Sequence, residues 1–221
     1  TSTPAKALKK EANRRRKLWD EDSPDKNKAG NRLVIIGYDG DKKYENVPSY
    51  IPGDTIKKVN GKTMTLIEFF VHSPFKDSLV EGRAESDKNV TSIVMQVRFK
   101  KSSSDTKPSA LYLFGGDADH YIWEEIQNQS SAHNNGGKLD FDIFLAPHHC
   151  SWTYFNDVPY KKGETDEPVE SSKKLIKDHK VSGAVIIASS KQINDDDDNP
   201  PHYPAKKEYV KLIGSSDKFI S

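Results

Sequence analysis

Two short segments of this chain gather the residue types that bind metal ions. Residues 115–120 read Gly-Gly-Asp-Ala-Asp-His and follow an apolar run at 110–114, and residues 147–152 read Pro-His-His-Cys-Ser-Trp and follow an apolar run at 141–146. Each apolar run predicts a buried strand that ends in a turn carrying carboxylate or imidazole groups. With one histidine further along the chain, the candidate site residues are Asp117, Asp119, His120, His148, His149 and His202.

Carboxylates and neutral imidazoles are the usual ligands of zinc and, with a larger share of oxygen, of manganese. A pair of such ions held about 3.5–4 Å apart needs a bridging carboxylate. Asp117 suits that role, because the two glycines before it would let a metal ion approach the backbone, and His148 would close the shell of one ion. We therefore expect two divalent ions, zinc or manganese, that activate a water molecule and polarise a phosphoryl or carbonyl oxygen.

Structural roles could account for some of the same residues. Asp117 or Asp119 could cap the helix predicted over 119–129, where a carboxylate is favoured. Of the two neighbouring histidines, one could lie in the core and the other on the surface. Cys150 could act as a nucleophile beside His149, although the sequence shows no orienting partner. The histidine at 72 could be structural or functional, and those at 133 and 179 are predicted to be solvated.

The apolar runs also predict the elements that position these turns. We expect strands at 32–36, 64–71, 90–99, 110–114, 141–146 and 181–188, and helices at 6–20, 119–129, 171–179 and 205–213. Asn60-Gly61 predicts a hairpin turn. Because only residues 100–109 separate two of the strands, we expect those two to pair. A strand meander followed by alternating strands and helices predicts an α/β fold with a mixed sheet, as in one half of a layered sandwich.

Composition sets further bounds. The chain has 221 residues, of which 34% are hydrophobic and 30% charged, and its net charge is +1. The length predicts one domain at 31–221, preceded by a basic helix and linker at 1–30. Near-neutral net charge does not indicate steering of the whole molecule toward nucleic acid or membrane. The basic cluster at 14–17 could bind phosphates, although a solvated helix face is the default interpretation.

Cysteine content and hydropathy bear on the compartment. A single cysteine excludes an intrachain disulfide and favours a reducing, cytoplasmic environment. No apolar run approaches the ~18 residues that a membrane helix needs, and no apolar segment of a signal peptide follows the basic N-terminus. The four aspartates at 195–198 predict a solvated acidic loop, since they lack the spacing of a calcium-binding loop.

Four motifs occur in order along the chain: Asn89-x-x-Ser92, Phe114-Gly-Gly-Asp117, Ala146-Pro-His-His-x-Ser151 and Asn199-x-x-His202. Together they resemble the metallo-β-lactamase fold, and within it the branch that includes the C-terminal hydrolase domain of the bacterial DNA-uptake channel. The resemblance spans residues 64–213. It implies that this chain is the second half of an αββα-like sandwich.

The resemblance also implies roles for individual residues. Asp117 would be the bridging metal ligand, and His148 the late histidine ligand with His149 beside it. His202 would line the rim of the active site. The asparagine and serine of the first motif would shape the start of their strand. Asp119 and the histidine that follows it have no firm equivalent, so they would support the ligands or cap the helix.

Two departures from the family pattern matter. The glycine that follows the double histidine in the family is Cys150 here, and the family's His-x-His-x-Asp-His motif is absent. That motif belongs to the first half of the fold, so we expect an N-terminal fragment to supply it. Thr1 would then be a cleavage point or a chain break. The alternatives are a degenerate, inactive homologue and a chain shortened at its N-terminus.

The leading functional hypothesis is a metal-dependent phosphodiesterase, a nuclease acting on DNA, completed by the N-terminal fragment. A hydrolase that needs its other half invites control by an activating protease, for example in a bacterial defence or toxin system. One alternative is a small-molecule hydrolase that acts on a lactone, a thioester or a cyclic nucleotide. The other is a non-catalytic regulatory subunit with a vestigial site.

Overall fold

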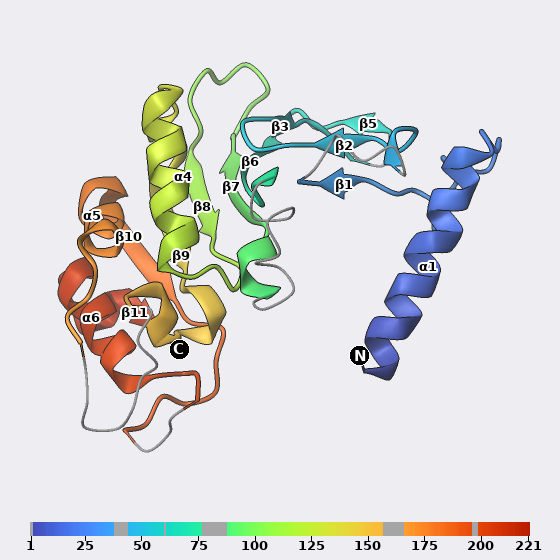
Figure 1. Ribbon diagram of the computed structural model, residues 1–221. Coiled ribbons are helices and arrows are strands. Elements are labelled where there is room, and N and C mark those ends of the chain that lie inside the picture. Colours follow the sequence, from blue (N-terminus) through green and yellow to red (C-terminus); the bar gives the residue numbers. More distant parts are fainter. Residues whose placement is uncertain (1, 38–43, 60, 77–87, 157–165, 196–198) are drawn as a thin grey trace.

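A seven-stranded mixed sheet forms the centre of the fold, and its strand order is β11-β10-β9-β8-β7-β6-β3 (Figure 1). The computed structural model describes residues 2–37, 44–59, 61–76, 88–156, 166–195 and 199–221. The strands of this sheet are β3 (Thr55–Ile56), β6 (Ile67–Ser73), β7 (Val94–Phe99), β8 (Ala110–Phe114), β9 (Phe141–Leu145), β10 (Lys180–Ile187) and β11 (Phe219–Ile220). Strands β8 to β11 run parallel, and β3, β6, β7 and β8 pair antiparallel. The predicted α/β class with a mixed sheet is therefore confirmed.

Three helices follow the parallel strands in turn: α4 (His120–Ala132), α5 (Glu170–His179) and α6 (Tyr203–Ile213). Each parallel strand lies beside the one before it, so right-handed crossovers place all three helices on one face of the sheet. Figure 1 shows these helices packed together along the parallel strands. On this face Leu113, Phe144 and Ile186 are fully buried, and they join the helices in the main hydrophobic core.

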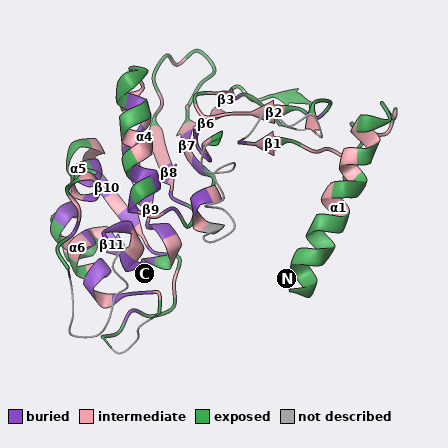
Figure 2. Ribbon diagram, viewed as in Figure 1, coloured by how far each residue is buried: buried purple, intermediate pink, exposed green. Residues whose placement is uncertain are grey.

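The opposite face of the parallel strands is also apolar, but it is covered less. Side chains alternate between the two faces of a sheet. The immediate neighbours of the three core residues are Tyr112, Phe114, Ile143, Leu145, Val185 and Ile187, and all six are only half-buried (Figure 2). None of the three helices covers these residues. Helices therefore cover one face of the parallel strands, and the opposite face is apolar and only partly buried.

The N-terminal part of the described chain lies to one side of this sheet. Helix α1 (Thr3–Asp20) contains no buried residue (Figure 2). After it, β1 (Ile35–Ile36) pairs parallel with β2 (Ser49–Tyr50), and β4 (Lys58–Val59) pairs antiparallel with β5 (Lys62–Thr63). The 3-10 helices are η2 (Lys88–Thr91), η3 (Gly136–Lys138), η4 (Pro147–His149), η5 (Trp152–Tyr154) and η6 (Ser216–Lys218). No helix in these described segments is long and apolar enough to cross a membrane.

The sequence predicted the α-helices and most strands of the seven-stranded sheet, but several other elements differ. The strand expected at 32–36 shrinks to two residues in a separate small sheet. Its ladder begins where the N–H of Ile35 donates to the Pro48 carbonyl, and Pro48 has no N–H to extend it. The strand expected at 90–99 begins only at Val94, because a 3-10 helix occupies 88–91. Strands β2 and β11 were not predicted. Strands β4 and β5 form the hairpin expected around residues 60–61, although Asn60 itself lies outside the described residues.

A candidate metal centre at the ends of strands β8 and β9

The two turns that carry the candidate ligands lie side by side. Strands β8 and β9 are parallel and pair Phe114 with Leu145, so both strands end at the same edge of the sheet. Beyond that edge the backbone N–H of His148 donates to the carbonyl oxygen of Gly116 at 2.9 Å. The sequence-based expectation that neighbouring strand ends bring these turns together therefore agrees with the structure.

The glycines of the first turn permit this close approach. A Cβ atom at Gly115 would lie 2.5 Å from Cγ of Pro147 and 3.0 Å from the Leu145 carbonyl oxygen. At Gly116, where φ is +55°, a Cβ would lie 3.1 Å from the Ile93 carbonyl oxygen. The glycines thus make room for the second turn and for the chain before β7.

Asp117 is exposed, and its backbone is held by Ser92, which lies just before β7. Its N–H donates to Oγ of Ser92 at 3.1 Å. The carbonyl of Ser92 accepts a hydrogen bond from Oγ of Ser73 at 2.7 Å, and the same Oγ accepts the N–H of Val94 at 3.1 Å. A chain of hydrogen bonds from β6 and β7 therefore fixes the position of the Asp117 backbone and leaves its carboxylate at the surface.

Asp119 and His120 take different positions. Asp119 is the N-cap of α4, and its Oδ1 accepts the N–H of Ile122 at 3.0 Å. This contact is the helix cap that the sequence suggested for Asp119. His120 is the first residue of α4 and is only 4% exposed, and neither ring nitrogen has a hydrogen-bond partner among the described residues. A buried imidazole without a partner loses its hydration, so a water molecule or an ion at this ring would stabilise it.

The second turn has an unusual backbone. His148, His149 and Cys150 have φ angles of 48°, 57° and 69° in succession. The left-handed region costs an L-residue about 1–2 kcal/mol, and such strain is retained where the surroundings enforce it, often at functional sites. The two imidazole rings lie at the sheet edge with their centroids 6.3 Å apart.

The rings of His149 and His148 differ in their hydrogen bonding and in their burial. Nδ1 of His149 lies 2.7 Å from the carbonyl oxygen of Ser189, just beyond β10. A carbonyl only accepts, so Nδ1 carries a proton, and in the neutral ring Nε2 then keeps its lone pair. A backbone carbonyl on one ring nitrogen is a common arrangement for a metal-binding histidine. His149 is exposed, whereas His148 is half-buried, and its Nδ1 is buried with no partner in the described part of the chain.

His202 lies beneath the turn rather than on an open rim. It is 5% exposed, and its Nδ1 accepts the backbone N–H of Trp152 at 2.8 Å. Its own N–H donates to the Cys150 carbonyl oxygen at 3.0 Å. In the neutral ring the accepting Nδ1 is unprotonated, so the proton resides on Nε2.

Cys150 is fully buried, and this burial raises the pKa of its thiol to about 12. The thiol therefore stays protonated at neutral pH, whereas a catalytic cysteine is reactive as the thiolate. This environment argues against the alternative of a cysteine nucleophile.

The candidate ligands at this edge form an incomplete set. Within the described segments no group of three His, Cys, Asp or Glu side chains converges as a metal ion would require. Asp117, His148 and His149 are of the kinds that zinc and manganese prefer, but these three side chains supply part of a coordination shell only. The sequence did not single out Ser189. Its place after a third parallel strand is the signal that could have found it.

The basic cluster at 14–17 is engaged within its own segment. Arg14 contacts Glu11 at 2.7 Å and the Gly30 carbonyl oxygen at 3.2 Å, and Arg15 donates to Glu11 at 2.8 Å. The hydrogen bonds from Arg14 and Arg15 lower the pKa of Glu11 to about 2. Arg16 and Lys17 lie 3.8 Å and 3.5 Å from the carboxylates at 20 and 21. Of the acidic run, only Asp195 lies within the described residues, and it is exposed.

The other histidines have structural contacts. Nε2 of His72 donates to the Lys138 carbonyl oxygen at 2.9 Å, and burial lowers its pKa to about 4. Nδ1 of His133 lies 2.9 Å from the Gln129 carbonyl oxygen, and Nδ1 of His179 lies 2.9 Å from Oδ1 of Asp140.

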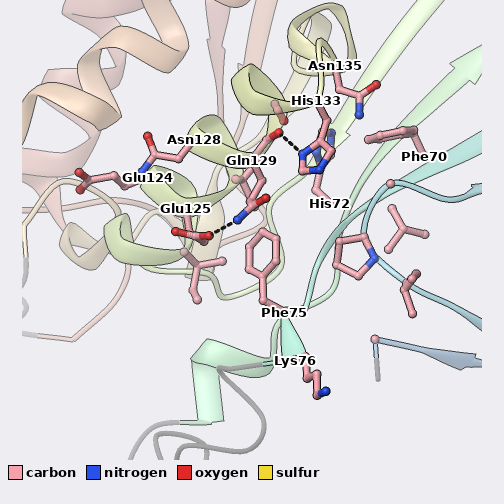
Figure 3. Close-up of a pocket in the computed structure, with 18 of the residues that line it drawn as sticks. Phe70, His72, Phe75, Lys76, Glu124, Glu125, Asn128, Gln129, His133 and Asn135 are labelled. Atoms are coloured by element: carbon pink, nitrogen blue, oxygen red, sulfur yellow. Dashed lines mark hydrogen bonds between the residues drawn. The ribbon is translucent and has the colours of Figure 1, made fainter. Parts of the chain in front are cut away.

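A cavity of about 1200 Å³ lies between α4 and strand β6, away from these turns (Figure 3). Phe70, His72 and Phe75 lie on its strand side, and Glu125 and Gln129 on its helix side. Of the candidate site residues, none lines this cavity. Nε2 of Gln129 donates to Oε1 of Glu125 at 2.7 Å, so these rim groups are bonded to each other.

Comparison of the chain with protein-family models, with curated proteins and with solved structures found no match.

Proposed function

We propose that this chain is the C-terminal half of a metallo-β-lactamase-like hydrolase domain and contributes Asp117, His148 and His149 to a centre for two divalent ions, zinc or manganese. The observation that carries the proposal is the joined pair of turns at the ends of β8 and β9. It places a surface carboxylate and two histidines on turns that one backbone hydrogen bond joins, and in the neutral ring of His149 the bond from Nδ1 to the Ser189 carbonyl leaves Nε2 unprotonated.

The second apolar face of the sheet supports the idea of a missing half. Six apolar side chains on β8, β9 and β10 are half-buried there, whereas their neighbours on the helix-covered face are fully buried. Apolar area is stabilised by about 25 cal/mol per Å² when it is removed from water, so a second sheet that packs on this face would gain stability. An N-terminal fragment that carries the His-x-His-x-Asp-His motif is the partner we propose.

The chemistry follows from the residue types. Bound divalent ions would activate a water molecule and polarise a phosphoryl oxygen. The carboxylate of Asp117 would bind between them, and the strained turn would present the imidazoles of His148 and His149. The hydrogen bond from His149 to the Ser189 carbonyl would keep its ring oriented and raise its basicity.

The proposed substrate is DNA, and the support for it is the motif resemblance together with seven basic against two acidic residues at 1–20. Side chains that neutralise phosphates make binding dependent on salt, so cleavage should weaken as salt rises. Activation by a protease, a cytoplasmic location and a role in bacterial defence remain part of this proposal.

The test combines metal binding with nuclease assays. The chain, alone and with the polypeptide encoded directly upstream, would be titrated with Zn²⁺ and Mn²⁺ by calorimetry, alongside Asp117→Ala, His149→Ala and the control His133→Ala. We expect the pair to bind metal and to cut DNA, and both site variants to lose at least about tenfold in metal affinity. Metal binding without cleavage of DNA or RNA would favour a small-molecule hydrolase. Absence of metal binding would favour the regulatory subunit.

A further inference from the structure

Three consecutive left-handed residues need a restraint from outside the turn. Within the turn, the N–H groups of Cys150 and Ser151 both bond the Pro147 carbonyl oxygen, at 3.1 and 3.3 Å. These bonds close the turn, but they do not attach it to the core. His148 and His149 are attached through the Gly116 and Ser189 carbonyl oxygens, and the end of the turn at Cys150 is attached by a residue about fifty positions later in the chain, His202.

His202 bonds the backbone on either side of Ser151, the residue that follows the last left-handed one, Cys150. Its backbone N–H bonds the carbonyl oxygen of Cys150 at 3.0 Å, and its ring Nδ1 accepts the N–H of Trp152 at 2.8 Å. One residue thus satisfies an acceptor and a donor that lie two positions apart in the turn. Both bonds are made where water is excluded, because His202 is only 5% exposed.

His202 is itself fixed by the core. It is the N-cap residue of α6, and its carbonyl accepts the N–H of Lys206 at 3.2 Å. Helix α6 buries Ala205 and Tyr209 completely in the main hydrophobic core. The position of His202 therefore follows that of a helix packed on the sheet. Through its hydrogen bonds to Cys150 and Trp152, His202 in turn fixes the position of the turn that contains the two histidines.

The tautomer of His202 limits its role. With Nδ1 accepting a backbone N–H, the neutral ring carries its proton on Nε2. Neither nitrogen then has a lone pair to give to a metal ion. His149 differs, because its Nδ1 carries the proton in the neutral ring and its Nε2 therefore has a lone pair that can bind a metal ion.

We propose that His202 is a positioning residue, which fixes the left-handed turn presenting His148 and His149 and does not bind metal itself. The inference deepens the proposed function and rests on it for the catalytic meaning of the turn. The restraint on the turn stands on the hydrogen bonds alone.

The test compares His202→Asn with His202→Leu. An asparagine places its side-chain oxygen near the position of Nδ1 and keeps an acceptor for the N–H of Trp152, whereas leucine removes it. Nitrogen-15 NMR of labelled histidines would report the tautomer of His202 and the ring signals of His148 and His149. Leu212→Ala, a buried change elsewhere on α6, is the control for general loss of stability.

We expect His202 to show a protonated Nε2 and an unprotonated Nδ1. His202→Leu should shift the His148 and His149 ring signals, speed exchange of the Trp152 amide by at least about tenfold, and weaken Zn²⁺ binding by about 10–100-fold, the usual effect of losing a group that orients a ligand. His202→Asn should restore all three, and Leu212→Ala should leave the ring signals in place.

A protonated Nδ1, a His202 signal that shifts like a ligand when Zn²⁺ binds, or an asparagine variant as defective as the leucine variant would overturn the proposal. If the wild-type chain binds no Zn²⁺, the proposed function fails. The tautomer and ring signals then still decide whether His202 restrains the turn.

Discussion

The backbone N–H of His148 donates to the carbonyl oxygen of Gly116 at 2.9 Å, which ties the turn after β9 to the turn after β8. Two segments about thirty residues apart are thereby held in one place at the edge of a parallel sheet. The contact needs small residues at 115 and 116 and a left-handed backbone at 148–150.

Gly115→Ala tests how tightly the two turns pack. Its Cβ would lie 2.5 Å from Cγ of Pro147 and 3.0 Å from the Leu145 carbonyl oxygen, and neither group is a flexible chain end. We expect a loss of about 1–3 kcal/mol in the free energy of unfolding, as for overpacking elsewhere. Chemical denaturation measures it, with Gly136→Ala as the control because a Cβ there meets no atom within 4 Å. Equal effects of the two changes would contradict the prediction.

Asp119→Ala should remove the N-cap of α4 and lower stability by about 0.5–2 kcal/mol, because Oδ1 of Asp119 accepts the Ile122 N–H. Asp119→Asn keeps a capping oxygen and should retain most of the stability. Thermal unfolding measures both variants. If the asparagine variant lost Zn²⁺ binding while its stability stayed intact, Asp119 would be a ligand and not only a cap.

Two substitutions at position 150 separate the effect of backbone strain on stability from the effect of side-chain packing. Cys150→Ala and Cys150→Gly both delete the buried thiol, but only glycine adopts φ near +69° without strain. We expect the glycine variant to be the more stable of the two by up to about 1 kcal/mol. At Ser131, an exposed position in α4, the order should reverse, because alanine is favoured over glycine in helices by about 1 kcal/mol. The same order at both positions would refute the assigned strain.

His72 makes stability depend on pH. Burial lowers its pKa from 6.5 to about 4, so between these values the unfolded chain binds a proton that the folded chain does not. Stability should therefore rise with pH from about 4 to 6.5, with a total of up to about 3 kcal/mol from this residue. His72→Gln keeps an N–H donor toward the Lys138 carbonyl and removes the titration. Urea unfolding across this range should show a flatter profile in the variant, and an unchanged slope would count against the assignment.

Two neighbouring isoleucines of β10 test the two faces of the sheet. Ile186 is fully buried under the helices, and Ile187 is half-buried on the opposite face. Ile186→Ala should cost about 2–5 kcal/mol, and Ile187→Ala about 1 kcal/mol or less in the isolated chain. With the proposed N-terminal fragment present, Ile187→Ala should instead weaken association, which calorimetry can measure. Equal costs in the isolated chain would mean that the second face is already covered.

Local patterns in the sequence were sufficient for much of the fold. The apolar run at 110–114 became β8 with the predicted bounds, and α4 began directly after its capping Asp119. Such elements are predictable because their signals, hydrophobic period and capping chemistry, lie within a few residues. Strand β11 is only two residues long and pairs with β10 at the sheet edge, so no local pattern could reveal it.

The sequence by itself determined which side chains are available at the two strand ends, because Asp117, His148 and His149 directly follow buried apolar runs. Only the tertiary structure decided how each is used. His202 supports the turn that carries the two histidines, and Ser189, just beyond β10, orients His149. These roles depend on hydrogen bonds between segments about forty to fifty residues apart, and only the packing of strands and helices brings such segments together.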